Sequence, residues 1–173
     1  MVEKKYVVEN KQLLYEGPFS VPELYDTILQ WAGEKGMEEE IKVKREFVEE
    51  KRRAREWILE LWSELQHHIR EVLRVRVLMK NVTQEKVKLH GKLQTLDKGE
   101  VLINFDGILE TDWEGKWEQK PIVYFLKFTF ERYIYKYTQR KYDNNVAADL
   151  QSLHDTLNKV LSKYRVRPTD KPG

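Results

Sequence analysis

Residues 99–142, GEVLINFDGILETDWEGKWEQKPIVYFLKFTFERYIYKYTQRKY, decide the fold of this chain. In their first half, apolar and polar residues alternate with a period of two, the pattern of a half-buried β-strand. The positions expected to face inward are Val101, Ile103, Phe105, Leu109 and Trp113, and those expected to face outward are Asn104, Asp106, Glu110 and Asp112. Pro121 then suits the first turn of a helix. The apolar residues from Pro121 to Tyr137 predict a helix that is apolar on more than one side.

The segments before this stretch predict strands around one helix. Residues 5–15 predict one strand, or two short strands with a turn between them, and Gly17-Pro18 ends this segment. Ser20-Val21-Pro22-Glu23 is a capping box, in which Ser20 and Glu23 each satisfy a backbone N–H of the other, and it predicts a helix that Lys35-Gly36 ends. Residues 41–47 alternate again and predict a strand that leads into a hairpin.

Residues 57–73 fit two structures. Ile58, Leu61 and Leu65 have helical spacing, and propensity favours a helix, whereas Trp57, Leu59 and Leu61 have strand spacing. Because the flanking segments alternate and would pair with this one, we predict a strand to Leu65, a turn at residues 66–68 and a second strand over residues 72–82.

Two further segments, residues 87–99 and 145–164, predict a hairpin and a helix. Residues 87–93 alternate, and Asp97-Lys98-Gly99 is typical of a hairpin turn before the central strand. A last helix is expected over residues 145–164. Its apolar positions follow a heptad-like spacing, namely Val146, Leu150, Leu153, Leu157, Val160 and Tyr164. This seam packs either on its own domain or against a second copy.

The predicted fold class is therefore α+β. It is a mostly antiparallel, curved sheet with an N-terminal helix and C-terminal helices packed on it, in a helix-grip-like arrangement. Residues 1–164 are expected to form one domain, and residues 165–173 a short, basic, mobile tail.

Composition narrows the functional classes. The chain has 173 residues, no cysteine and a formal net charge of +2, which excludes disulfides and thiolate chemistry and leaves only local basic patches for nucleic-acid binding. No signal core follows Met1 and no apolar run approaches the roughly 20 residues of a membrane span. Many Lys and Glu without Cys fit a thermophile, so we expect a soluble, cytoplasmic protein that does not contact the membrane.

The residues suggest no catalytic or metal chemistry. No pair of the four histidines has ligand spacing with a carboxylate between, and adjacent His67 and His68 are expected to point apart. Asp106, Glu110 and Asp112 share one predicted strand face, where paired acids can serve a hydrolase, but a solvated face explains them more simply. We expect no metal, no cofactor and no enzyme.

Two basic clusters are the candidate binding residues. One predicted hairpin carries Lys51, Arg52, Arg53 and Arg55, which form a solvated turn or a phosphate-contacting loop. The other interleaves basic and aromatic side chains, namely Arg132, Tyr135, Lys136, Arg140, Lys141 and Tyr142. Rings of this kind stack on bases while the cations meet phosphates, or else the tyrosines pack and expose only their hydroxyls. The basic tail is expected to extend the second cluster.

Two stretches, LLYEGPFSVPELYDTILQWAGEKG at residues 13–36 and INFDGILETDWEGKWEQKPIVYFLKFTFERYIYKY at residues 103–137, resemble a family of small archaeal proteins. The family includes archaeal ribosome dimerisation (hibernation) factors. The similarity is one of layout across most of the chain, with no catalytic fingerprint. It implies a non-enzymatic homodimer that binds the small ribosomal subunit, both rRNA and ribosomal proteins, and joins two such subunits in dormant cells.

These observations lead to one functional expectation and one alternative. The expectation is ribosome binding through the two basic clusters, with the sheet edge or the last helix as the dimer seam. The alternative is a helix-grip cavity that binds a lipid-like ligand. Its lining would include Phe105, Trp113, Phe125 and Phe128.

Overall fold

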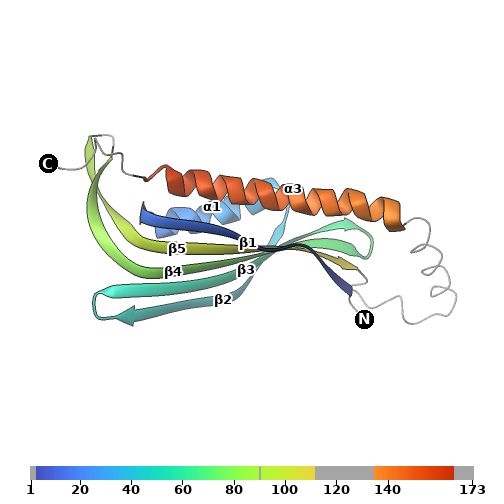
Figure 1. Cartoon of the computed structure of the whole chain (residues 1–173), viewed down its shortest axis with the longest axis horizontal. Helices are drawn as coiled ribbons and strands as arrows, with labels where there is room; N and C mark the ends of the chain where they lie inside the picture. Colours follow the sequence, from blue (N-terminus) through green and yellow to red (C-terminus); the bar gives the residue numbers. More distant parts are fainter. Residues whose placement is uncertain (1–2, 90, 112–134, 166–173) are drawn as a thin grey trace.

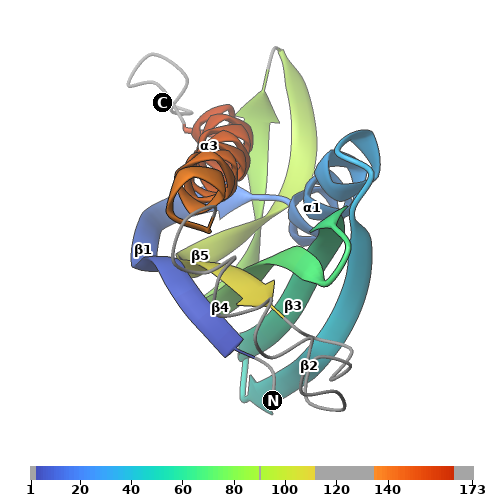
Figure 2. The ribbon, with the colours of Figure 1, turned by 90° about the vertical axis from the view of Figure 1, so that its right-hand side faces the viewer.

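One curved antiparallel sheet carries two helices on one of its faces. The computed structural model describes residues 3–89, 91–111 and 135–165. Its elements, in chain order, are β1 (Glu3–Phe19), α1 (Val21–Glu34), β2 (Glu38–Glu49), β3 (Arg52–Gln66), β4 (Ile69–Leu89), β5 (Lys92–Thr111) and α3 (Tyr135–Ser162). The strands lie in the order β1-β5-β4-β3-β2. Both helices lie on the same side of the sheet, α3 along its length and α1 beside β2 and β3 (Figures 1 and 2).

The α+β class and the antiparallel sheet are confirmed, but no helix stands at the N-terminus. The chain begins with β1, and the helix that the capping box predicts follows it. Ser20 is the N-cap, and its hydroxyl accepts a hydrogen bond from the Glu23 N–H at 3.3 Å. The Glu23 carboxylate does not turn back onto Ser20. It receives hydrogen bonds from Lys163 and Tyr164, so the start of α1 is tied to the end of α3.

The ambiguous residues 57–73 form strands, as predicted. Trp57, Leu59 and Leu61 are at most 4 % exposed, whereas Ile58 and Glu60 between them are half-buried, so the period is two. The long-range pairing of β3 with both β2 and β4 overrides the local helical propensity.

The predicted hairpin turn at Asp97-Lys98-Gly99 is wrong, because these residues lie inside β5. They pair with β1 on one side and β4 on the other. The chain reverses at Gly91 instead, where φ is +80°, a conformation that glycine adopts without strain. The Asp97 carboxylate accepts a hydrogen bond from the Val21 N–H at 3.2 Å and so helps to cap α1.

The last helix begins at Tyr135, ten residues before the predicted start, and its apolar seam faces the sheet of its own chain. Val146, Leu150, Leu153 and Leu157 are at most 1 % exposed. Gly107 on β5 permits this close packing, since a Cβ there would lie 2.8 Å from Val146 Cγ1. The chain's own core therefore fills the seam, which excludes it as a contact for a second copy.

Part of the predicted C-terminal helical region lies outside the described residues. This holds for most of the helix expected over residues 121–137, for Trp113 and Asp112, and for the tail after Arg165. Within the described part of the chain, neither helix combines the length and the apolar character that crossing a membrane requires.

Candidate nucleic-acid interface

The structure separates the two predicted basic clusters. The β2–β3 turn, which carries Lys51, lies at one end of the molecule with the curled ends of β4 and β5 (Figure 1). The start of α3, which carries Arg140 and Lys141, lies at the opposite end beside the N-terminus (Figure 1). A single compact binding surface therefore cannot include both clusters.

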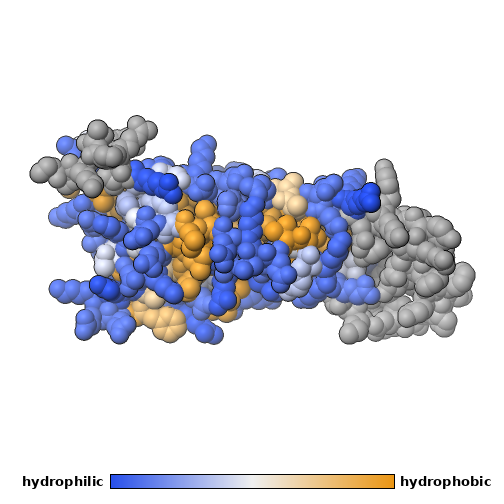
Figure 3. Space-filling model, in the orientation of Figure 1, coloured by the Kyte–Doolittle hydropathy of each residue, from blue (hydrophilic) through white to orange (hydrophobic). Residues whose placement is uncertain are grey.

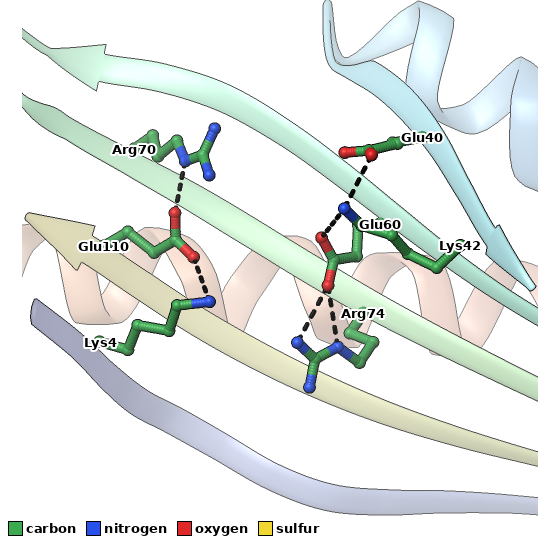
Figure 4. Close-up of polar contacts among 7 residues, drawn as sticks. All are labelled: Lys4, Glu40, Lys42, Glu60, Arg70, Arg74 and Glu110. Carbon is green, nitrogen blue, oxygen red and sulfur yellow. Dashed lines mark hydrogen bonds and ion pairs between the residues drawn. The ribbon is translucent and has the colours of Figure 1, made fainter. Parts of the chain in front are cut away.

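Most arginines on the open face of the sheet are neutralised by glutamates, and Figure 4 shows two of these groups on the side turned away from α3. In the first group, Glu110 accepts from Arg70 at 2.5 Å and pairs with Lys4 at 3.0 Å. In the second, Glu60 pairs with Arg74 at 2.9 Å and with Lys42 at 3.6 Å. Arg76 pairs in the same way with Glu56 at 2.8 Å. These cations are already matched within the chain and offer little charge to a phosphate.

The predicted outward orientation of Glu110 needs a correction. It is on the open face, but it is only 3 % exposed because Lys4 and Arg70 cover it. Burial alone raises its pKa, but the hydrogen bonds from Arg70 and Lys4 outweigh burial and hold the pKa below its ordinary value. Asp106 accepts a hydrogen bond from the Asn10 N–H at 2.7 Å. Both acids thus have partners in the chain, and the third member of the predicted acidic face, Asp112, lies outside the described residues.

The other end of the sheet gathers cations, most of which have no such partner. We call it the basic end and define it by Lys51, Arg52, Arg53, Lys80, Lys86, Lys88 and Lys98. In the described part of the structure, five of these side chains make no ion pair or hydrogen bond, namely Lys51, Arg52, Lys80, Lys86 and Lys88. Lys98 pairs with Glu85 at 3.0 Å. The surface in Figure 3 is mostly hydrophilic at this end, and its larger hydrophobic patches lie nearer the middle.

Of the four residues predicted for the first cluster, two are free and two are engaged. Lys51 and Arg52 extend without a partner among the described residues. Arg55 donates to Glu46 at 3.0 Å, and Arg53 lies 3.9 Å from the same carboxylate. The reason is the alternation of the strand, which turns Arg53 and Arg55 to the face opposite Arg52.

Three adjoining depressions shape the basic end. The first, of about 1090 Å³, includes Leu14, Leu78 and Leu102 on its floor and Lys80, Lys86 and Lys88 among its cations. The second, of about 1120 Å³, lies against the β2–β3 turn, and the third, of about 560 Å³, lies along β4 and β5. Lys80 lines the first two, and Arg52 lines the last two. The depressions therefore form one continuous surface.

A β-bulge sets the position of Lys80. The pairing of β4 with β5 shifts between Lys80 and Thr83, and Asn81 has a φ of +53°. Gly99 on β5 faces this bulge at a distance that excludes a side chain, because a Cβ there would lie 2.8 Å from the Lys80 carbonyl oxygen. Bulges of this kind redirect side chains beside functional sites.

We therefore expect Gly99→Ala to destabilise the protein by about 1–3 kcal/mol, since the backbone of β4 must move to admit the methyl group. Denaturant unfolding monitored by tryptophan fluorescence measures this. Gly33→Ala is the matched control: apart from its chain neighbours and the backbone of its own helix, no atom lies within 4 Å of the new Cβ. Alanine there should stabilise the protein. Equal effects of the two substitutions would contradict the role of Gly99.

The second predicted cluster is only partly described. Arg140 and Lys141 are exposed on α3, while the Tyr142 ring is half-buried and its hydroxyl donates to Gln66 at 2.6 Å. Arg132 lies outside the described residues, as do the side chains of Tyr135 and Lys136. Tyr142 thus packs with its hydroxyl outward, and its ring is not a free stacking surface.

Arg165 is the one described residue of the predicted basic tail, and it lies at the basic end and not beside the second cluster. Arg165 lies over the Tyr15 ring, 5.8 Å from its centroid, and it lines the same depression as Lys80 and Lys86.

Lys80, Lys86, Lys88 and Lys98 are candidate binding residues that the sequence alone did not single out. They stand on two strands, and only the register of β4 with β5 brings them together. Their signal was present as the polar side of an alternating segment, but alternation alone does not tell a solvated face from a binding face.

The histidines do not form a metal centre in the described part of the chain. No three His, Asp or Glu side chains there are placed to hold a metal ion. The expectation that His67 and His68 point apart is wrong, because their ring centroids are 3.8 Å apart. The positive φ of His68, +67°, ends the strand alternation at this turn.

Comparisons of the chain with protein-family models, with curated proteins and with solved structures found no match.

Proposed function

We propose that the protein is a non-enzymatic, ribosome-associated factor that binds the small ribosomal subunit through its basic end. The resemblance described above supplies the identity of the partner. The geometry supports a partner rich in phosphate, such as rRNA, for the reason given next.

The observation that carries the proposal is the contrast between paired and free cations on one sheet. Arg70, Arg74 and Arg76 are each matched by a glutamate. Lys51, Arg52, Lys80, Lys86 and Lys88 are exposed and unmatched among the described residues. Glutamates also line these depressions, but the five cations form no ion pair within the described chain. They are therefore available to neutralise the phosphates of a polyanionic partner, with release of bound salt ions.

A homodimer is part of this proposal, and the edge of β2 is the better seam. The α3 seam is buried, and β1 is flanked by α3, to which Lys5 on β1 is tied through Asp143. The outer edge of β2 meets no other strand of the described sheet, and Ile41 and Val48 on it are 48 % and 66 % exposed. The unpaired backbone groups of a sheet edge can pair with a second chain.

Sedimentation of cell extract through a sucrose gradient tests the proposal. At low salt we expect the protein in the small-subunit fractions, and at high salt among the free soluble proteins, because screening weakens phosphate contacts. The proposal fails if the protein stays with the free soluble proteins at low salt.

The helix-grip arrangement and the binding of a lipid-like ligand remain a second proposal with less support. Phe105, the described member of the expected cavity lining, is 0 % exposed and lies in the core, with its ring centroid 5.5 Å from that of His154. Trp113, Phe125 and Phe128 lie outside the described residues. Native mass spectrometry of the purified protein tests for a co-purified apolar ligand and also counts the subunits.

A further inference from the structure

The depression beside the β2–β3 turn has an aromatic wall and a cationic wall. Phe47 on β2 pairs with Ala54 on β3, and the bulge of β4 that carries Lys80 lies opposite Ala54. All three residues line the depression of about 1120 Å³. The small side chain of Ala54 thus leaves a hollow between the Phe47 ring and the Lys80 ammonium group.

Phe47 is unusual for its exposure in this setting. Its side chain is 58 % exposed and belongs to neither hydrophobic cluster of the described residues. Lys51, Arg52 and Arg53 line the same depression. An exposed aromatic ring contributes little to folding, but beside cations it matches a ligand that joins a flat ring to a negative charge.

The remaining lining residues suit the same ligand. The left-handed backbone of Asn81, with φ of +53°, places an amide side chain at the depression. Glu49 and Glu50 line it as well, and their carboxylates can accept from base amino groups. The Arg52 guanidinium, which has no partner among the described residues, has the fork geometry that binds phosphate.

We propose that this depression binds one unpaired RNA nucleotide, with its base stacked on Phe47 over Ala54 and its phosphates on Arg52 and Lys80. The inference rests on the proposed function and specifies it further: the basic end recognises single-stranded or looped-out RNA, not only the backbone of a duplex. A base held in a duplex is already stacked on its neighbours and cannot lie on Phe47.

The test compares two probes. One is a short single-stranded oligoribonucleotide that contains 2-aminopurine, whose fluorescence falls when the base stacks. The other is the same strand annealed to its complement. The wild-type protein should quench the single strand on binding. Phe47→Leu should remove the quench and weaken single-strand affinity about tenfold. Duplex affinity, which depends on the cations, should not change.

Two further variants complete the design. Ala54→Leu keeps the ring but fills the hollow, so it should also remove the quench and leave duplex binding intact. Tyr6→Leu is the matched control, since Tyr6 is also an exposed aromatic residue, 45 % exposed, near the start of β1 and opposite Ile108 of β5, far from the β2–β3 turn. Native mass spectrometry of each variant should give the same number of subunits as the wild type. A different number would show that the substitution also affects pairing at the β2 edge.

The outcomes separate the inference from the proposed function. If Phe47→Leu affects both probes equally, or no more than Tyr6→Leu, the nucleotide site is wrong. If the double variant Arg52→Glu with Lys80→Glu still sediments with small subunits, the proposed binding through the basic end is wrong. Loss of sedimentation in that double variant, together with an unaffected Phe47→Leu, overturns the nucleotide site alone.

Discussion

Reversing two charges at the basic end, Arg52→Glu with Lys80→Glu, should lower the affinity for small-subunit RNA about a hundredfold at low salt. Each residue lines two of the three depressions, and neither has a partner among the described residues. Each lost phosphate contact also lowers the slope of log affinity against log salt by about one. A salt titration of the variant and the wild type by fluorescence anisotropy measures both effects.

The matched control changes the same charge at the other end of the molecule. Arg140→Glu with Lys141→Glu alters two exposed cations on α3, and we expect RNA affinity to fall little. Neither double variant breaks an ion pair of the described structure, so the free energy of unfolding should stay close to that of the wild type. If the α3 pair abolishes binding and the basic-end pair does not, the interface lies at the start of α3, where the aromatic and basic residues alternate.

The fold was predictable wherever the local signal was complete. The capping box at Ser20 and Glu23 located the start of α1, and the alternation of Val101, Ile103 and Phe105 identified their buried face. The prediction failed at Asp97–Gly99, because the same residues can form a turn or lie within a strand. Here the Asp97 carboxylate helps to cap α1, and Gly99 allows the backbone of β4 to approach closely. Tertiary contacts decided between these uses.

The candidate site was less predictable because charge in a sequence does not tell whether a counter-ion is near in space. Arg52 and Arg55 belong to the same basic run, but only Arg55 meets Glu46 across the hairpin. Lys80 and Lys98 belong to segments that looked like plain strand faces. Their approach depends on a bulge at Asn81 and on the register of β4 with β5. Phe47 looked like one apolar position of an alternating strand, whereas its exposure is a property of the unpaired edge.

A second large effect concerns stability and comes from a buried acid on the helix-facing side of the sheet. Glu71 on β4 is 2 % exposed, and its Oε1 accepts from the Ser63 hydroxyl at 3.1 Å. Its Oε2 is buried and receives no hydrogen bond. Burial and then the neighbouring Asp149 carboxylate on α3 raise the pKa of Glu71 to about 7, although Ser63 and Lys35 act in the opposite direction. A proton on Glu71 allows it to donate to Asp149.

The sign of the pH dependence follows from this raised pKa. Below pH 4.5, the ordinary pKa of Glu, the group is protonated in both the folded and the unfolded state and does not affect stability. Between pH 4.5 and about 7 the unfolded chain loses the proton while the folded protein keeps it, so stability falls as the pH rises. Above pH 7 the loss is complete and amounts to about 3 kcal/mol, because a tenfold difference in proton affinity between the two states corresponds to about 1.36 kcal/mol.

Glu71→Gln should therefore stabilise the protein by up to about 3 kcal/mol at pH 8 and leave it nearly unchanged at pH 4.5. The amide is neutral at every pH, nearly fills the volume of the acid and can donate to Asp149. Urea unfolding at a series of pH values gives the free energy for each protein. Glu39→Gln, at an exposed position of β2, is the control that removes a charge without removing a buried one, and it should leave the slope with pH intact. Two outcomes would contradict this prediction: a wild type that gains stability from pH 5 to 7, or a Glu71→Gln variant that keeps the wild-type slope. Either would mean that Glu71 does not hold the proton in the folded state and that no such proton stabilises the contact between α3 and β4.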